Sequence, residues 1–185
     1  IPLRLVGSEM CIRDRLVGCK EELNKECESL AKVSEQTDKN INNYKMAWNA
    51  FFETRDSNAI NTDSFDEQVT VVTAEGNITG IEAFRDYYNN YLTGFSDAEF
   101  NFVDVIGQGD KIVKHWNFKG THDGEMFGIP ATNKKVDISG TTVVLMKDGK
   151  VLQEQDFFDN YSFLMQLGLL AVSYTHLTLP TIYSV

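Results

Sequence analysis

The sequence predicts an α+β domain in which N-terminal helices pack against a mostly antiparallel sheet. Residues 41–55 and 81–92 repeat apolar side chains at helical spacing, and both segments come early in the chain. Runs rich in β-branched and aromatic residues follow them. Asp148 and Gly149 separate the last two of these runs, and Asp-Gly in that position is a strong hairpin signal. Helices followed by consecutive hairpins are typical of the α+β class.

The individual elements follow from composition and turn signals. The helix at 41–55 leads through a polar connection, or a short second helix, to a strand at 68–73. Residues 74–77 turn the chain toward the helix at 81–92. The strands of the hairpins are expected at 99–106, 111–119, 134–147 and 150–158.

Composition excludes several classes of function. The chain has 185 residues, a length typical of one domain, and 42% of them are hydrophobic. Its formal net charge of −10 and the lack of clustered Lys and Arg disfavour a nucleic-acid partner and an anionic membrane surface. No apolar run reaches the roughly 18 residues that a membrane-spanning helix needs. We therefore expect no nucleic-acid partner.

Both ends of the chain differ in composition and periodicity from the region between them. Residues 1–15 and 171–185 resemble translated sequencing-adapter sequence, so we leave them out of the fold prediction. The alternative for the C-terminal tail is a real terminal strand, because its THLTL segment alternates like one. The domain is then expected at residues 41–170.

Residues 16–40 precede the domain. Leu16-Val17-Gly18-Cys19 resembles the lipobox of bacterial lipoprotein precursors, and a polar segment typical of a tether follows it. The apolar region that should precede a lipobox is absent, as expected if adapter sequence replaced it. The resemblance implies lipidation of Cys19 and anchoring in the bacterial cell envelope, with the membrane contacted only through that lipid. The alternative is a chance motif in a cytoplasmic protein.

Three C-terminal motifs carry a family resemblance. They are GTHDGEMFGIP at 120–130, DGK at 148–150 and DFFDNYSFLMQLG at 156–168. They resemble the SnoaL-like polyketide cyclase group of the NTF2-like superfamily, and the pattern extends over about residues 42–170. The resemblance implies an NTF2-like cone, in which a strongly bent sheet wraps the helices and leaves a pocket. It also implies a homodimer that pairs through the sheet.

Asp156 is the candidate acid/base. A carboxylate among apolar side chains suits proton transfer at a carbon acid, and Asp156 directly precedes two phenylalanines. The resemblance assigns the same role, because the family's general acid/base Asp matches Asp156. The alternative is a solvated carboxylate at a strand end. The family's histidine on the preceding strand is replaced here by Thr142, which can donate a hydrogen bond but cannot shuttle protons near neutral pH.

The register across the last hairpin decides what faces Asp156. A regular two-residue turn places Asp156 opposite Thr141, whereas a one-residue bulge places it opposite Thr142. Asp159 is expected to cap the final helix, and Glu154 is expected at the surface.

Other residues are candidates for the pocket wall. His122 lies in the loop at 120–124, where the family also has histidine, and it either acts on the ligand or holds the loop. Strand alternation places Trp116 and Phe118 inward and His115 outward. Phe127 belongs to an apolar loop that is either a lid or a packed turn. Tyr88 belongs to an aromatic helix stripe that packs the core or directs hydroxyl groups into the cavity.

These observations predict a site for a small, apolar, oxygenated or cyclic molecule. Asp156 and His122 are the catalytic candidates, in a cofactor-free cyclisation, isomerisation or hydrolysis. No Gly-rich phosphate loop, nucleophile elbow or two-histidine metal motif is present in the sequence, so no metal or cofactor is expected. The alternative is a non-catalytic ligand-binding or assembly module of an exported lipoprotein. The expected ligand contacts are Trp116, Phe118, Thr142, Phe127, Tyr88 and Phe158.

Overall fold

The computed structural model describes the backbone of residues 8–170 and the side chains of residues 25–170. Its helices are α1 (Ser8–Thr54), η1 (Ser57–Ala59, a 3₁₀ turn), α2 (Ile81–Gly94) and α3 (Asn160–Gln166). Its strands are β1 (Phe65–Thr73), β2 (Gly76–Thr79), β3 (Glu99–Gln108), β4 (Lys111–Thr121), β5 (Lys135–Lys147) and β6 (Lys150–Phe158). The adapter-like tail at 171–185 lies outside the described residues, as do residues 1–7.

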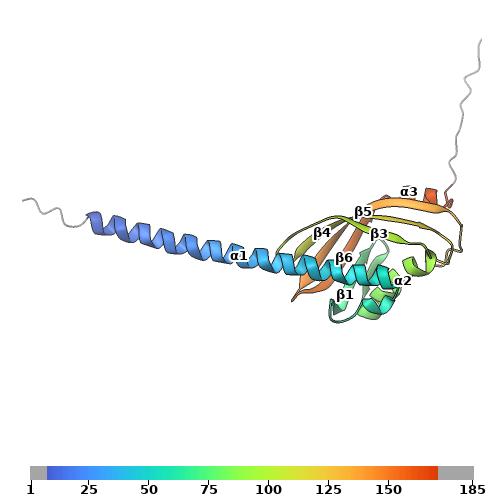
Figure 1. The fold of residues 1–185 in the computed structure, drawn as a ribbon, viewed down its shortest axis with the longest axis horizontal. Coiled ribbons are helices and arrows are strands. Elements are labelled where there is room, and N and C mark those ends of the chain that lie inside the picture. Colours follow the sequence, from blue (N-terminus) through green and yellow to red (C-terminus); the bar gives the residue numbers. More distant parts are fainter. Residues whose placement is uncertain (1–7, 171–185) are drawn as a thin grey trace, which may run out of the picture.

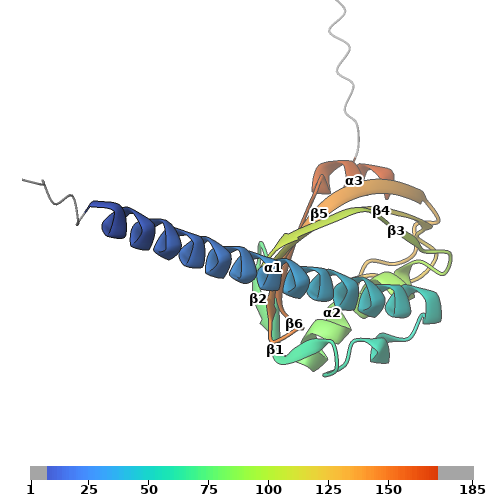
Figure 2. The ribbon, with the colours of Figure 1, turned by 60° about the vertical axis from the view of Figure 1, so that its left-hand side comes forward.

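The strands form one sheet in the order β2-β1-β6-β5-β4-β3. Only the β1–β6 pair is parallel among the strand pairs of residues 8–170. The sheet bends around α2 and the C-terminal half of α1, while the N-terminal half of α1 stands away from it (Figures 1 and 2). This arrangement confirms the predicted α+β cone. The prediction missed β2, because its first two residues, Gly76 and Asn77, were assigned to the preceding turn.

Helix α1 begins much earlier than the sequence predicted. The expected start was residue 41, after a polar tether, but the structure continues one helix back to Ser8. Glu and Lys are the most frequent residues of the added turns and are good helix formers, and Glu35 and Lys39 form an i,i+4 ion pair. The side chain of Cys19 lies outside the described residues. No helix within residues 8–170 is both long and apolar enough to cross a membrane.

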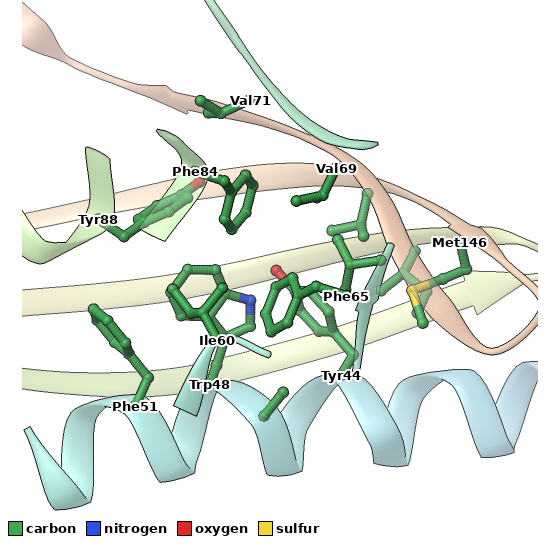
Figure 3. Packing of buried hydrophobic residues seen from close by; sticks show 14 of the residues in the cluster. Tyr44, Trp48, Phe51, Ile60, Phe65, Val69, Val71, Phe84, Tyr88 and Met146 are labelled. Carbon is green, nitrogen blue, oxygen red and sulfur yellow. The ribbon is translucent and has the colours of Figure 1, made fainter. Parts of the chain in front are cut away.

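The main core lies between the helices and the concave face of the sheet. Tyr44, Trp48 and Phe51 are buried on one face of α1, at the spacing that brings i, i+4 and i+7 side chains together. Figure 3 shows them pointing toward Phe65 of β1 and Phe84 of α2. Each buried aromatic side chain stabilises the fold by about 1.5–3 kcal/mol. This packing fixes both helices against the sheet.

A second core closes the opposite end of the sheet, where Phe163 of α3 packs with Phe95 and Phe118. Asp159 caps α3, since its carboxylate accepts a hydrogen bond from the Ser162 backbone N–H at 3.0 Å. This confirms the predicted cap. Helix α3 is thereby held at the end of β6, immediately after the candidate acid/base.

The β5–β6 hairpin turns at Asp148 and Gly149, as predicted. Both residues have positive φ, 50° and 78°, which a type I′ turn requires. The register then shifts by one residue, because Met146 pairs with Val151 but Leu145 pairs with Gln153. The shift is a bulge on β6, and it places Asp156 opposite Thr142. Of the two predicted registers, the structure therefore has the bulged one.

Candidate functional site

An inner cavity of about 40 Å³ lies between the helices and the sheet. Its apolar wall consists mainly of Trp48, Phe52, Phe100, Trp116, Phe118 and Phe158. Among the described residues that line it, only Lys114 of β4 and Asp156 of β6 carry charge. A cavity of about 150 Å³ is enough to bind benzene, so the inner cavity accepts only a small group and not a ring.

An outer groove of about 620 Å³ adjoins the inner cavity. Residues from α2, β1, β6, α3 and the loop around Phe127 line the groove. Tyr91, Asp156 and Phe158 border both spaces. The Asp156 side chain therefore lies where a small space meets one large enough for a ring system.

Two hydroxyl groups hold the Asp156 carboxylate. The Thr142 hydroxyl donates to Oδ1, and the Tyr88 hydroxyl donates to Oδ2 at 2.9 Å. Thr142 in turn accepts a hydrogen bond from Trp116 Nε1 at 2.9 Å. Asp156 is partly buried and lies two residues before the end of β6. Its surroundings differ from the solvated strand end considered as the alternative.

The sequence predicted Glu154 at the surface, and the structure shows that this prediction was wrong. Its side chain is completely buried, and it accepts hydrogen bonds from Trp48 Nε1 at 2.9 Å and from the Tyr88 hydroxyl at 3.2 Å. Side chains two apart on a strand share a face, so an inward Asp156 implies an inward Glu154. That alternation was the overlooked signal.

Burial raises the pKa of Glu154 to about 7, against the opposing effect of Lys114, and the charge of Asp156 raises it further. Glu154 therefore changes its protonation state near neutral pH. Two carboxyl groups on one face of β6 thus share a donor, the Tyr88 hydroxyl.

Lys114 was not predicted as a site residue. Its side chain is 3% exposed, and Nζ lies over the rings of Trp48, Tyr44 and Phe100 at 4.7, 5.2 and 5.2 Å from the ring centroids. Attraction between an ammonium group and aromatic faces stabilises this position. The alternation that places Trp116 inward also places Lys114 inward, so strand periodicity was sufficient to find it.

Tyr88 is a hydrogen-bond donor to both carboxylates. Burial raises its pKa well above the usual value, and the charges of Asp156 and Glu154 raise it further. The pKa of the buried Tyr44 is raised in the same way, first by burial and then by Glu154. The Tyr44 hydroxyl has no hydrogen-bond partner among residues 25–170. Both phenols therefore keep their protons near neutral pH, and the Tyr88 hydroxyl acts as a donor.

His122 lies apart from these residues, and it borders neither the inner cavity nor the outer groove. Its buried ring packs against Phe95, and the Thr132 N–H donates to Nδ1 at 3.3 Å. Burial lowers the pKa of His122, which favours the neutral ring. The structure thus does not bring His122 together with Asp156, and these contacts match the loop-holding alternative.

The remaining predicted contacts divide between the two spaces. Trp116 and Phe118 face the inner cavity as predicted, and His115 on the same strand is exposed. Phe127 borders the outer groove, where it packs on Tyr87 and Tyr91. Thr142 borders neither space and acts through its hydrogen bond to Asp156.

Metal binding has no support in the described side chains. Within residues 25–170, no three His, Cys, Asp or Glu side chains are grouped so that they could hold an ion. Asp156, Glu154, Lys114 and Tyr88 are suited to proton transfer and hydrogen bonding.

Comparison with solved structures supports the fold. A candidate SnoaL-like polyketide cyclase from Jannaschia sp. CCS1 aligns with a TM-score of 0.67 and 18% identity, over 74% of this chain and 96% of its own. TsrD from Streptomyces laurentii aligns with a TM-score of 0.63 and 22% identity, over 71% and 96%. TerC, co-crystallised with polyporic acid, aligns with a TM-score of 0.57 and 19% identity, over 70% and 98%.

A comparison with curated proteins gave no match. The sequence profile of the SnoaL-like polyketide cyclases matches residues 43–167, which include α2, the whole sheet and α3. The motifs, the bent sheet and this match agree, and the chain belongs to the SnoaL-like polyketide cyclase family.

Proposed function

We propose that this protein binds a small, oxygenated, cyclic molecule in the outer groove and that Asp156 transfers a proton at a carbon next to a carbonyl group. The proposed reaction uses no cofactor. The observation that carries it is the position of Asp156, which borders both the inner cavity and the outer groove. The outcome of the reaction would be a cyclisation or an isomerisation.

The two volumes determine how a ligand meets Asp156. A ring system does not fit into about 40 Å³, whereas the outer groove offers about 620 Å³. Ligand sites in proteins are typically about 300–1,000 Å³. The ring of the ligand therefore belongs in the outer groove, with its reacting carbon toward Asp156.

The hydrogen bonds of Asp156 leave it able to act as a base. Each carboxylate oxygen has two acceptor positions, and the structure fills one on each, from Thr142 and from Tyr88. The two donors fix the orientation of the carboxylate. An acceptor position on each oxygen remains for a substrate proton, and a positioned general base contributes roughly 10²–10⁴-fold to a rate.

The comparisons support a small organic ligand in this fold. One structural neighbour is a candidate polyketide cyclase, and TerC was co-crystallised with polyporic acid. We propose a small organic ligand of this kind for the present chain.

A module that binds the same ligand without turnover is the second candidate. Thr142 favours it, because the hydroxyl cannot shuttle a proton as the family's histidine does. The N-terminal half of α1, which stands away from the sheet, would then link the module to a lipid anchor at Cys19 (Figure 1).

Exchange of the α-protons of 2-tetralone in D₂O, followed by proton NMR, tests the proposal. The Asp156→Asn variant should lose at least about 100-fold in the exchange rate while its circular dichroism stays unchanged. Asp86→Asn is the charge-matched control, since Asp86 is exposed on α2. Exchange that persists in Asp156→Asn contradicts the catalytic proposal. Binding of 2-tetralone without any exchange by the unaltered protein favours the binding module.

A further inference from the structure

The buried ammonium group of Lys114 has no part in the proton transfer proposed for Asp156. Nζ makes no ion pair within 4.0 Å and no hydrogen bond with any side chain or backbone group of residues 25–170. Removing a charge from water without such partners costs several kcal/mol. The charge of Lys114 acts on Glu154, whose pKa it lowers, but its N–H groups donate to no residue of 25–170.

The surroundings of Lys114 direct it toward the inner cavity. Three aromatic rings, from Trp48, Tyr44 and Phe100, surround Nζ at 4.7–5.2 Å. Ring faces attract the charge but provide no conventional acceptor atom, so the three N–H groups remain available to a ligand oxygen. Lys114 and Asp156 line the same inner cavity.

The size of the inner cavity also suits a single ligand oxygen beside Lys114. At about 40 Å³ it accepts one oxygen atom with its carbon, or a water molecule, but not a ring. A ligand whose ring occupies the outer groove could therefore place only a protruding polar group there. A carbonyl oxygen attached to the ring is such a group.

We propose that Lys114 binds the carbonyl oxygen of the ligand in the inner cavity and stabilises the oxyanion that forms there when Asp156 removes the neighbouring proton. This inference rests on the proposed function and names its electrophilic partner. The ligand class is a planar ketone or phenol that presents one oxygen beyond the edge of its ring.

The step balances in atoms and charge. The C–H bond next to the carbonyl breaks, and the proton goes to the Asp156 carboxylate, which becomes neutral. The electron pair of that bond forms a C=C bond, and the carbonyl π pair moves to the oxygen. One negative charge thus moves from Asp156 to the ligand oxygen, beside the unchanged charge of Lys114. A donor preorganised in an apolar site stabilises such developing charge more strongly than water does.

Binding of 4-nitrophenolate tests the inference without turnover. This probe is a stable planar oxyanion, and nitrobenzene is the neutral probe of nearly the same shape. Calorimetric titration of the full chain, at a pH where the free phenol is ionised, gives both dissociation constants. Lys114→Met and Lys114→Gln should weaken 4-nitrophenolate binding by roughly 10- to 100-fold, the range expected for one charged hydrogen bond. Nitrobenzene binding should change by less than about twofold, since the shape of the site is retained.

Lys111→Met is the matched control, because Lys111 is exposed on the same strand. It should change neither dissociation constant. Phenolate binding that survives in both Lys114 variants overturns the inference. An equal loss of affinity for both probes would indicate a structural role of Lys114 and also overturns the inference. A lack of 4-nitrophenolate binding by the unaltered protein overturns it as well.

The Asp156→Asn exchange measurement separates this inference from the proposed function. If Asp156→Asn retains exchange while the Lys114 variants lose phenolate binding, only the proposed function fails. If Asp156→Asn loses exchange while the Lys114 variants bind phenolate normally, only the role of Lys114 fails.

Discussion

Asp156 lies directly opposite Thr142 on neighbouring strands, and the Thr142 hydroxyl donates a hydrogen bond to the Asp156 carboxylate. The bulge near the hairpin turn creates this pairing. The same hydroxyl accepts from Trp116 Nε1 at 2.9 Å, so three strands contribute to one hydrogen-bonded chain. The orientation of the candidate base is therefore determined by the register of the sheet.

Thr142→Val should disrupt this chain while preserving side-chain volume. It leaves the buried Trp116 N–H without its acceptor, and we expect a loss of about 1–3 kcal/mol in the free energy of unfolding, measured by urea titration. We also expect slower exchange of 2-tetralone, since Asp156 loses one of its two donors. Thr142→Ser keeps the hydroxyl and should retain most of the rate. Equal rates in the Val and Ser variants would contradict an orienting role for the hydroxyl.

Glu154→Gln should remove a pH dependence of stability. The folded protein holds the Glu154 proton up to about pH 7, whereas an ordinary glutamate loses it near the usual value of 4.5. Between these values the folded state binds more protons, so stability present below pH 4.5 is lost as pH rises toward 7. The expected loss is about 3 kcal/mol. Glu154→Gln should lack this decline.

Urea unfolding across that pH range measures the effect, with Glu67→Gln as control because Glu67 is exposed on β1. The control should follow the unaltered protein at every pH. A Glu154→Gln variant with the same decline would show that Glu154 is not the titrating group.

Tyr88→Phe removes one hydroxyl that donates to both acids, at 2.9 Å to Asp156 and 3.2 Å to Glu154. The exchange rate of 2-tetralone should fall by roughly tenfold, which corresponds to the loss of one hydrogen bond to a charged group. Tyr87→Phe is the matched control, since Tyr87 makes no hydrogen bond to either acid. An equal effect of the two variants would mean that ring packing, rather than the hydroxyl, matters.

Gly140→Ala should disturb the site through packing alone. A Cβ atom there would clash with the Trp116 ring and lie 2.8 Å from the Phe157 backbone oxygen. Trp116 would have to move away from Thr142, and overpacking of this kind costs about 1–3 kcal/mol. Thermal unfolding should show the lower stability, and tryptophan fluorescence should report the moved ring. An unchanged melting temperature would contradict the tight approach of β5 to Trp116.

The sequence was sufficient for the fold and for part of the site. The helical periodicity of residues 81–92, the Asp148-Gly149 turn and the capping signal at Asp159 are local, and each was found where predicted. Asp156 could be selected because it stands among aromatic residues in a family motif. These features depend on neighbours in sequence, which a single chain displays directly.

The remaining site residues depend on contacts between distant segments. Lys114 and Glu154 are charged residue types that usually lie at the surface. Their burial follows from Trp48 and Tyr88, which come from helices far away in the sequence. Alternation along β4 and β6 indicated that both side chains face inward. The sequence prediction did not use it, because charged side chains are expected at the surface. The helix start at Ser8 was missed because a charged, helix-forming segment resembles a tether in composition.

The central claim is that a ligand in the outer groove meets Asp156 at the mouth of the inner cavity. A crystal structure of the protein with 2-naphthol, a stable planar analogue of the 2-tetralone enol, tests it most directly. The account predicts naphthalene rings against Tyr91 and Phe158 in the outer groove, with the carbon next to the oxygen facing the Asp156 carboxylate. A 2-naphthol molecule bound elsewhere, or an Asp156 covered by protein side chains in the complex, would contradict it.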